Sequence, residues 1–214
     1  MERVNIGCGK TPIEGWRNYD NSLSVYLSIH PLICFILSNI GLLNDNQKDF
    51  IAFAQKNDIR WADATKGVPL PDKSVEVLYT SHMVEHLCQD DLKRFFKEAR
   101  RILIPNGIIR VVVPDLRKLI DEYLLDGDGN KFIERTLLAH PKPNKMADKI
   151  KFLIVGNRHH QWMYDGPSMA LLLSSMGFLK PRILPPGATI IPDPGELPLK
   201  ERADESVYLE AQSP

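Results

Sequence analysis

Short apolar runs alternate along this chain with longer segments whose apolar residues follow helical spacing. The apolar runs predict strands at residues 3–7, 16–20, 59–62, 75–80, 108–113, 178–184 and 207–210. The helical spacing predicts helices at residues 23–29, 32–40, 47–56, 90–103, 116–125, 131–139, 145–155 and 168–176, with residues 126–130 as a loop. Strands that alternate with helices are typical of an α/β doubly wound sheet, and the apolar run at 108–113 predicts its central buried strand.

One long segment carries no charge. Between Asp20 and Asp45 there is no Asp, Glu, Lys or Arg, and the segment is long enough to span a bilayer. Its polar and helix-breaking residues disfavour a spanning helix: Asn21, Ser22, Ser24, Ser28, His30, Pro31, Ser38, Asn39, Gly41 and Asn44. We therefore expect a pair of buried helices, or a lid, broken at Pro31, with contact to a membrane surface as the alternative.

Composition narrows the class of protein. The chain has 214 residues, 43% hydrophobic and 25% charged, which suits one globular domain over residues 1–214. The 27 basic and 27 acidic residues balance, so charge gives no case for nucleic acid as a partner. Three cysteines without a Cys-x-x-Cys pair, and an N-terminus unlike a signal peptide, favour the cytoplasm. The oligomeric state is open.

The segment Val4–Asp20 holds the first candidate binding site. The first strand breaks at Gly7 and Gly9, where a chain without Cβ atoms lets a ligand approach the backbone. The next strand ends on Asp20, and a carboxylate at that place can bind both hydroxyls of a ribose. The third glycine of a dinucleotide-binding loop is missing and no P-loop is present, so the pattern indicates an adenosine without phosphates.

Several blocks together resemble the class I S-adenosylmethionine-dependent methyltransferases of the small, type-11-like kind. The blocks are NIGCG at 5–9, Asp20, WADA at 61–64, VPLPD at 68–72, SVEVLY at 74–79, SHMVEHL at 81–87, EARRILIPNG at 98–107 and SVYLEA at 206–211. The resemblance implies a Rossmann-like, doubly wound, mostly parallel sheet of about seven strands with an antiparallel last strand. It also implies that residues 21–57 are an apolar helical insertion in the methyltransferase domain.

The resemblance implies a cofactor, S-adenosylmethionine, and S-adenosylhomocysteine as its product. It assigns cofactor binding to Asn5, Gly7, Cys8, Gly9, Asp20, Asp63, Ala64 and Ser81. In that assignment the glycines line the methionine part, Asp20 binds the ribose, and Asp63 with Ala64 lies beside the adenine. Asn5 stands where many relatives have an acidic residue, which implies a weaker or water-mediated contact to the cofactor's ammonium group.

The segment His82-Met-Val-Glu85-His86 follows the fourth predicted strand and matches the H-x-x-E-H metal pattern. On a helix, His82 and His86 would share one face and could hold zinc, as in a hydrolase. No third ligand is evident and the context is a nucleotide-type sheet, so we expect no metal. His86 could instead be a packing residue, whereas His82 or Glu85 could take a proton from the methyl acceptor. Accordingly, His82, Glu85 and His86 are the candidate catalytic residues.

A second cluster at residues 158–165 supplies candidates for acceptor binding. His160, Trp162 and Tyr164 match a His-x-Trp-x-Tyr-Asp segment of the family, and aromatic faces with polar edges suit a sugar or a ring. Both aromatic residues could equally be core residues. The function predicted is methyl transfer to an oxygen or nitrogen of a small molecule or glycan. The alternatives are a cofactor-binding scaffold without activity and, as a minor one, a zinc hydrolase.

Overall fold

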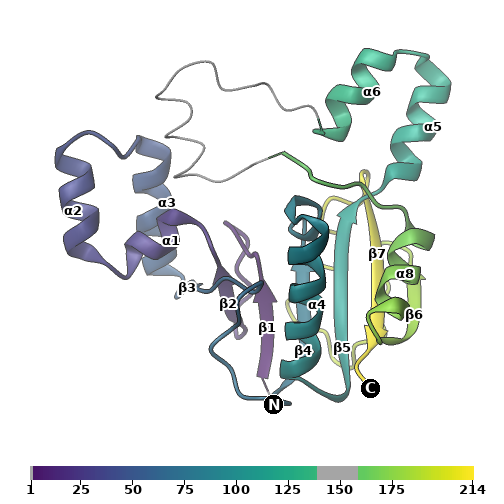
Figure 1. Ribbon diagram of the computed structural model, residues 1–214, viewed down its shortest axis with the longest axis horizontal. Coiled ribbons are helices and arrows are strands. Elements are labelled where there is room, and N and C mark those ends of the chain that lie inside the picture. The colour runs from purple at the N-terminus through teal and green to yellow at the C-terminus, as the bar shows by residue number, and fades with distance from the viewer. Residues whose placement is uncertain (1, 139–158) are drawn as a thin grey trace.

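The computed structural model describes residues 2–138 and 159–214, which form one seven-stranded sheet in the order β3-β2-β1-β4-β5-β7-β6 (Figure 1). The strands are β1 (Glu2–Ile6), β2 (Arg17–Asp20), β3 (Arg60–Trp61), β4 (Val75–Ser81), β5 (Leu103–Pro114), β6 (Leu179–Leu184) and β7 (Ser206–Gln212). The first five run parallel, and β7 is antiparallel to both β5 and β6. This topology confirms the predicted Rossmann-like sheet with its antiparallel last strand.

The described helices follow the predicted ones closely. They are α1 (Leu23–Ser28), α2 (Pro31–Asn39), α3 (Asp45–Lys56), α4 (Gln89–Ile102), α5 (Leu116–Asp126), α6 (Gly129–Thr136) and α8 (Gly166–Ser175), with a 3-10 turn η1 (Val84–His86). The helix predicted at 145–155, and the end of the one predicted at 131–139, lie outside the described residues.

Two predicted boundaries are wrong, and the cause is local in each case. Residues 126–130 are not all loop, because the Asp128 carboxylate accepts hydrogen bonds from Asn130 and Lys131 and starts α6 at Gly129. The helix predicted at 90–103 ends at Ile102, and the strand predicted at 108–113 begins earlier, at Leu103, because Leu103 already pairs with Val75.

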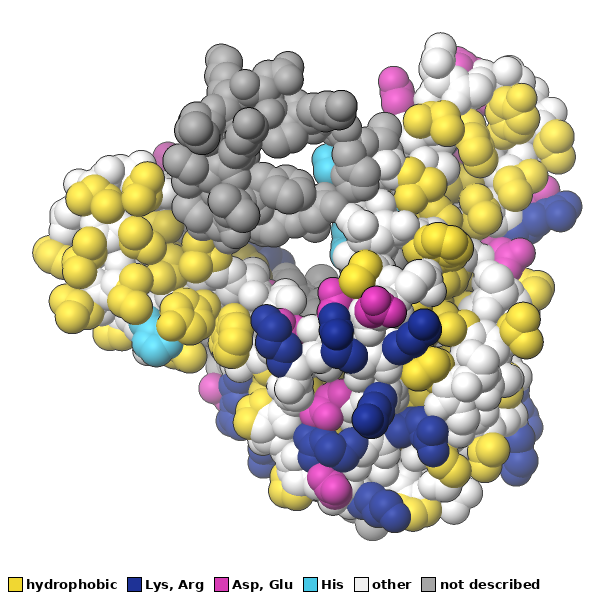
Figure 2. Space-filling view, in the orientation of Figure 1, with side chains coloured by type: hydrophobic (Ala, Val, Ile, Leu, Met, Phe, Trp, Pro, Cys, Tyr) yellow, Lys and Arg dark blue, Asp and Glu magenta, His cyan; other side chains and the backbone are white. Residues whose placement is uncertain are grey.

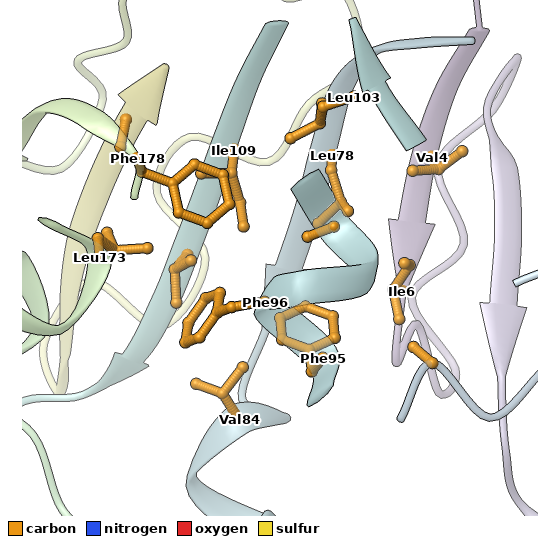
Figure 3. Packing of buried hydrophobic residues seen from close by; sticks show 14 of the residues in the cluster. Val4, Ile6, Leu78, Val84, Phe95, Phe96, Leu103, Ile109, Leu173 and Phe178 are labelled. Atoms are coloured by element: carbon orange, nitrogen blue, oxygen red, sulfur yellow. The ribbon is translucent and has the colours of Figure 1, made fainter. Parts of the chain in front are cut away.

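The main core lies between the sheet and the helices α4 and α8. Phe95 and Phe96 of α4 are fully buried against strand residues that include Leu78 and Ile109 (Figure 3). Two aromatic side chains from one helix bury a large apolar area, which holds α4 over β4 and β5. The carboxyl ends of the parallel strands are thereby fixed at one edge of the sheet.

The uncharged segment forms a helical unit beside that edge, together with α3. Asn44 and Gln47 cap α3 reciprocally, and α1 buries Val25 and Leu27. The expectation of two buried helices is wrong for α2, which contributes no buried residue. Figure 2 shows hydrophobic side chains gathered over this unit, on the left of the view. None of the described helices meets the length and hydrophobicity that crossing a membrane requires.

Candidate functional site

The predicted cofactor residues lie on one edge of the sheet because they follow parallel strands. Gly7 follows β1, Asp20 ends β2, Asp63 follows β3 and Ser81 ends β4. In doubly wound sheets, ligands bind outside the carboxyl ends of the strands. Figure 1 places α1–α3 and α5–α6 beyond this same edge, on either side of α4.

The glycine corner is built from backbone hydrogen bonds. The N–H groups of Gly7 and Cys8 both donate to the carbonyl of Tyr19, at 2.8 and 3.1 Å. Gly7 has φ +76°, and a Cβ on it would lie 2.5 Å from Cγ of Met83, so neither the backbone nor the packing accepts a larger residue there. Gly9 has φ +50° and open space where its Cβ would stand, which leaves its backbone accessible.

The carboxylate of Asp20 is fixed by backbone donors from both sides. Its Oδ2 accepts from Gly9 N at 3.0 Å, and its Oδ1 accepts from Ser22 N at 2.8 Å, at the start of α1. Each carboxylate oxygen has a second lone pair, and the side chain is half-buried, so acceptor capacity remains for a ligand hydroxyl.

Asn5 has a role inside the protein. Its side chain is buried, and its Nδ2 donates to the carbonyl of Thr11 at 3.1 Å and to Oδ1 of Asn18 at 3.2 Å. Asn18 also accepts from Ile13 N at 2.8 Å. The two asparagines therefore shape the short connection between β1 and β2. Asn18 is not among the residues that the sequence predicts for the site, because its only signal is a polar side chain inside a short buried strand.

Asp63 and Cys8 have distinct electrostatic environments. Burial raises the pKa of Asp63, but hydrogen bonds from Thr65 and Lys66 outweigh this and hold the pKa below its ordinary value. Burial, with the nearby charge of Asp20, raises the pKa of the Cys8 thiol, which packs against Val25. Cys8 is therefore a neutral wall residue, whereas Asp63 is ionised near neutral pH.

The histidine–glutamate cluster does not lie on one helix, which corrects the predicted i, i+4 geometry. His82 has φ +50°, and only the 3-10 turn from Val84 to His86 follows it. The turn is tight because His82 N donates to the carbonyl of Val112 at 2.9 Å, in continuation of the β4–β5 pairing. His82 and His86 consequently do not share one helix face.

Glu85 is the most deeply buried member of the cluster. It has 0% exposure, and burial raises its pKa to about 8. Neither carboxylate oxygen has a hydrogen-bond partner among the described residues. Two ring nitrogens lie within 4.0 Å of Oε1: Nδ1 of His82 at 3.5 Å and Nε2 of His160 at 3.9 Å.

The three histidines are held in place by protein acceptors and hydroxyls. His82 Nε2 lies 2.8 Å from Oγ of Ser206, His86 Nδ1 lies 3.2 Å from the carbonyl of His159, and His160 Nδ1 lies 2.8 Å from the carbonyl of Thr136. Burial lowers the pKa of all three, that of His82 to about 3, so the rings are neutral near pH 7.

The predicted acceptor residues run beside the turn that carries Glu85. The N–H groups of Gln161 and Trp162 donate to the carbonyl of Glu85 at 2.7 and 3.2 Å. Trp162 is 51% exposed, whereas Tyr164 is buried and burial raises its pKa to about 12. The structure thus joins the two clusters, but only Trp162 presents a large surface to solvent.

Comparison with known proteins agrees with this geometry. Residues 41–111 match the family model described as a methyltransferase domain. No curated protein matches the sequence of this chain.

Solved structures extend the likeness to the whole chain. A S-adenosylmethionine-dependent methyltransferase from Thermotoga maritima is 16% identical, with a TM-score of 0.53 over 100% of this chain and 82% of its own. One from Methanosarcina mazei is 13% identical, with a TM-score of 0.52 over 99% and 92%. DhpI, in a complex with S-adenosylhomocysteine, is 10% identical, with a TM-score of 0.52 over 99% and 76%.

The fold is that of S-adenosylmethionine-dependent methyltransferases of known structure, and residues 41–111 match a methyltransferase-domain model. The described residues fit S-adenosylmethionine as a cofactor, because an open glycine backbone and a carboxylate with spare acceptor capacity meet at one edge of the sheet.

Proposed function

We propose that this protein is an S-adenosylmethionine-dependent methyltransferase that acts on an oxygen or nitrogen of a small molecule or a glycan. The observation that carries the proposal is the corner where Gly9 N and the Asp20 carboxylate meet at 3.0 Å beside an open glycine backbone. When bound there, S-adenosylmethionine supplies a methyl group on a sulfonium that is already a good leaving group. The acceptor gains the methyl and loses a proton.

The proposed cofactor contacts follow from the positions of the residues on the sheet edge. Gly7 and Gly9 would line the methionine part, and Asp20 would accept from the ribose hydroxyls. Asp63, ionised near neutral pH, would accept from the adenine amino group, with the backbone of Ala64 beside the ring and Ser81 near the sulfonium. Cys8 would contribute an apolar wall, and Asn5 would act by shaping the loop.

Catalysis would depend mainly on positioning. His82 has both ring nitrogens turned toward protein groups, and Glu85 is fully buried, so these two side chains favour holding the site over contacting the acceptor. His86 is only partly buried and lies closest to the segment that precedes α8. Alignment of acceptor, methyl and sulfur, with exclusion of water, can supply most of the acceleration.

The acceptor would bind between the turn after β4 and the chain before α8. Trp162 offers an exposed aromatic face there, and its sequence neighbours Tyr164 and His160 are buried. An aromatic face with polar neighbours suits a sugar or a ring, and the balanced charge of the chain disfavours a nucleic acid.

The domain and its location complete the proposal. Residues 1–214 would form a single methyltransferase domain, in which residues 21–57 are an apolar helical insertion. The free thiols of Cys8, Cys34 and Cys88 suit the reducing cytoplasm. The exposed apolar surface of α2 is compatible with contact to a membrane surface.

Two measurements test the function. Calorimetric titration with S-adenosylhomocysteine should show binding to the folded protein, and its absence would contradict the cofactor assignment. Incubation with S-adenosylmethionine labelled at the methyl group should then transfer label to members of a panel of hydroxyl and amine compounds and oligosaccharides. Binding without transfer to any member of the panel or to a cell extract would favour the inactive scaffold.

A further inference from the structure

Three acceptor groups from two separate chain segments converge next to the proposed methyl-transfer site, with Glu85 and His160 buried and His86 partly buried. Glu85 and His86 lie on the turn after β4, and His160 lies just before α8. One ligand atom of each residue lies within 4.8 Å of the other two, and Glu85 Oε1 is 3.9 Å from His160 Nε2. The rings of His86 and His160 meet edge to face, with centroids 5.0 Å apart.

The hydrogen bonds of the two histidines determine which ring nitrogens carry the protons. His86 Nδ1 lies against the carbonyl of His159, and His160 Nδ1 lies against the carbonyl of Thr136. A carbonyl only accepts, so each Nδ1 carries a proton, and in a neutral imidazole Nε2 then presents its lone pair. Two imidazole lone pairs and a carboxylate are thus the groups available at the cluster.

Among residues 2–138 and 159–214, no Lys or Arg nitrogen lies within 4.0 Å of the Glu85 carboxylate. Both oxygens of Glu85 are buried without a hydrogen-bond partner among the described residues. The one nearby ring that could donate, His82, places its Nδ1 3.5 Å from Oε1, and Arg202 acts on the cluster only through its charge at longer range. Burying an ionised carboxylate in this way costs on the order of several kcal/mol of folding free energy, unless a cation or a proton binds to it.

We propose that Glu85, His86 and His160 bind a divalent transition-metal ion, with Zn²⁺ as the best chemical match. Two imidazole nitrogens and one carboxylate oxygen are a donor set that zinc accepts, with room for water as a fourth ligand. Metal-binding histidines usually donate their other N–H to a backbone carbonyl or a carboxylate, as both histidines do here. This departs from the absence of a metal that the sequence predicts.

The distances between the three ligand residues require only small side-chain adjustments to bind one zinc ion. In a tetrahedral site, zinc bonds of about 2.0–2.2 Å put two ligand atoms roughly 3.3–3.6 Å apart, so the 3.9 Å between Glu85 Oε1 and His160 Nε2 has to shorten by a few tenths of an ångström. His82 is a neighbour of the site and no ligand, because its Nε2 is engaged with Ser206. The ion would tie the turn after β4 to the chain before α8, and this binding does not depend on the methyl-transfer proposal.

The test uses the full chain and Zn²⁺ alone. Metal-free protein should bind one equivalent of Zn²⁺ in a calorimetric titration, and Co²⁺ should give absorption bands that Zn²⁺ removes. Glu85→Gln and His160→Asn should each weaken binding by more than about 100-fold, the upper end of what outer-shell changes cost. His30→Asn, which alters a histidine at the start of α2, should leave binding unchanged.

Two outcomes would overturn the proposal. One is wild-type protein that is folded by circular dichroism but binds neither Zn²⁺ nor Co²⁺, which would leave Glu85 as a protonated acid. The other is full Zn²⁺ binding by Glu85→Gln and His160→Asn. If a variant fails to fold, the Co²⁺ spectrum of the wild type decides, since it reports nitrogen and oxygen ligands directly. Titration with S-adenosylhomocysteine, done separately, keeps this result distinct from the cofactor assignment.

Discussion

The backbone N–H of Gly9 donates to Oδ2 of Asp20 at 3.0 Å and thereby joins the loop after β1 to the end of β2. The carboxylate is held at the mouth of the glycine corner before any ligand arrives. A preorganised acceptor of this kind binds without a large ordering cost. The contact therefore links the short β1–β2 connection to cofactor affinity.

Replacing the Asp20 carboxylate should weaken cofactor binding. In Asp20→Asn one oxygen becomes an NH₂ group that faces donors, so hydrogen bonds to the ribose and to Gly9 N or Ser22 N are lost. A charge-assisted hydrogen bond is worth about 1.5–3 kcal/mol, so S-adenosylhomocysteine should bind roughly 10- to 150-fold more weakly in calorimetry. Asp58→Asn, an exposed carboxylate just before β3, is the control, and an equal loss in both variants would contradict the assignment.

Gly7 should tolerate no side chain, for reasons of both backbone and packing. Gly7→Ala combines φ +76° with a Cβ placed 2.5 Å from Cγ of Met83. A non-glycine residue at positive φ costs about 1–3 kcal/mol, and the clash adds to this. Gly127→Ala is the matched control, because it has φ +66° and open space around the new Cβ. Urea unfolding should show the larger loss for Gly7→Ala, and equal losses would leave Met83 without a role.

The carboxylate of Glu98 should stabilise the fold in a pH-dependent way. It accepts from the guanidinium of Arg101 and from Val68 N, and these hydrogen bonds, Arg101 first, hold its pKa below the ordinary 4.5. Since the folded pKa is depressed, the stabilisation is complete above the unfolded pKa and disappears as the pH falls through the folded pKa.

The variant Glu98→Gln tests this linkage. At pH 7 it should lower the free energy of unfolding by about 1.5–3 kcal/mol, the usual loss for a hydrogen bond to a charged group. As the pH falls below 4.5 the difference from wild type should shrink, because wild-type Glu98 gains a proton as the pH falls through its lowered folded-state pKa. As a control, Asp90→Asn, which changes an exposed carboxylate on the same helix, should have little effect on stability in either pH range. If Glu98→Gln differed from wild type by the same free energy in both pH ranges, the pH-dependent role of Glu98 would be ruled out.

Arg110 and Glu210 form a fully buried ion pair between β5 and β7, and they are direct partners in the strand register. Arg110→Met should destabilise the protein by about 3–5 kcal/mol, because it leaves a buried carboxylate unpaired. Glu210 also accepts from Thr189 and from Ile190 N, so the pair fixes the loop before β7 as well.

A double-mutant cycle with Glu210→Gln measures this coupling. The combined variant should lose less stability than the sum of the two single losses, by at least about 1 kcal/mol, as residues in contact do. Denaturant unfolding of the four proteins gives the number. Additive losses would show that the two side chains contribute separately.

The order of strands and helices could be predicted because local rules and tertiary packing agree along most of the chain. The strands appear in the sequence as short apolar runs, and α4 appears as helical spacing around Phe95 and Phe96. Both patterns arise because these residues are buried in the core that covers the sheet. The glycine corner was predictable for a related reason, since Gly7, Gly9 and Asp20 stand at strand ends by sequence alone.

The structure differs from the prediction where contacts with distant segments of the chain determine the local conformation or the burial of a residue. Arg110 interrupts the apolar run of the central strand and is buried only because Glu210, one hundred residues later, pairs with it. His82 and His86 were expected on one helix, but the hydrogen bond of His82 N to Val112 extends the sheet and leaves room for one 3-10 turn.

The sequence by itself determined the sheet, its carboxyl edge and the residues of the glycine corner, because neighbouring residues define strand ends. Only the tertiary structure decided that Asn5 binds the loop and that His160 meets Glu85 and His86. It also decided that α2 lies on the surface. The Asn5 contacts depend on how the short loop folds back, and the meeting of His160 with Glu85 and His86 depends on segments far apart in the chain. No local pattern of polar and apolar positions encodes which partner a buried polar group will find, or whether an apolar helix will be covered.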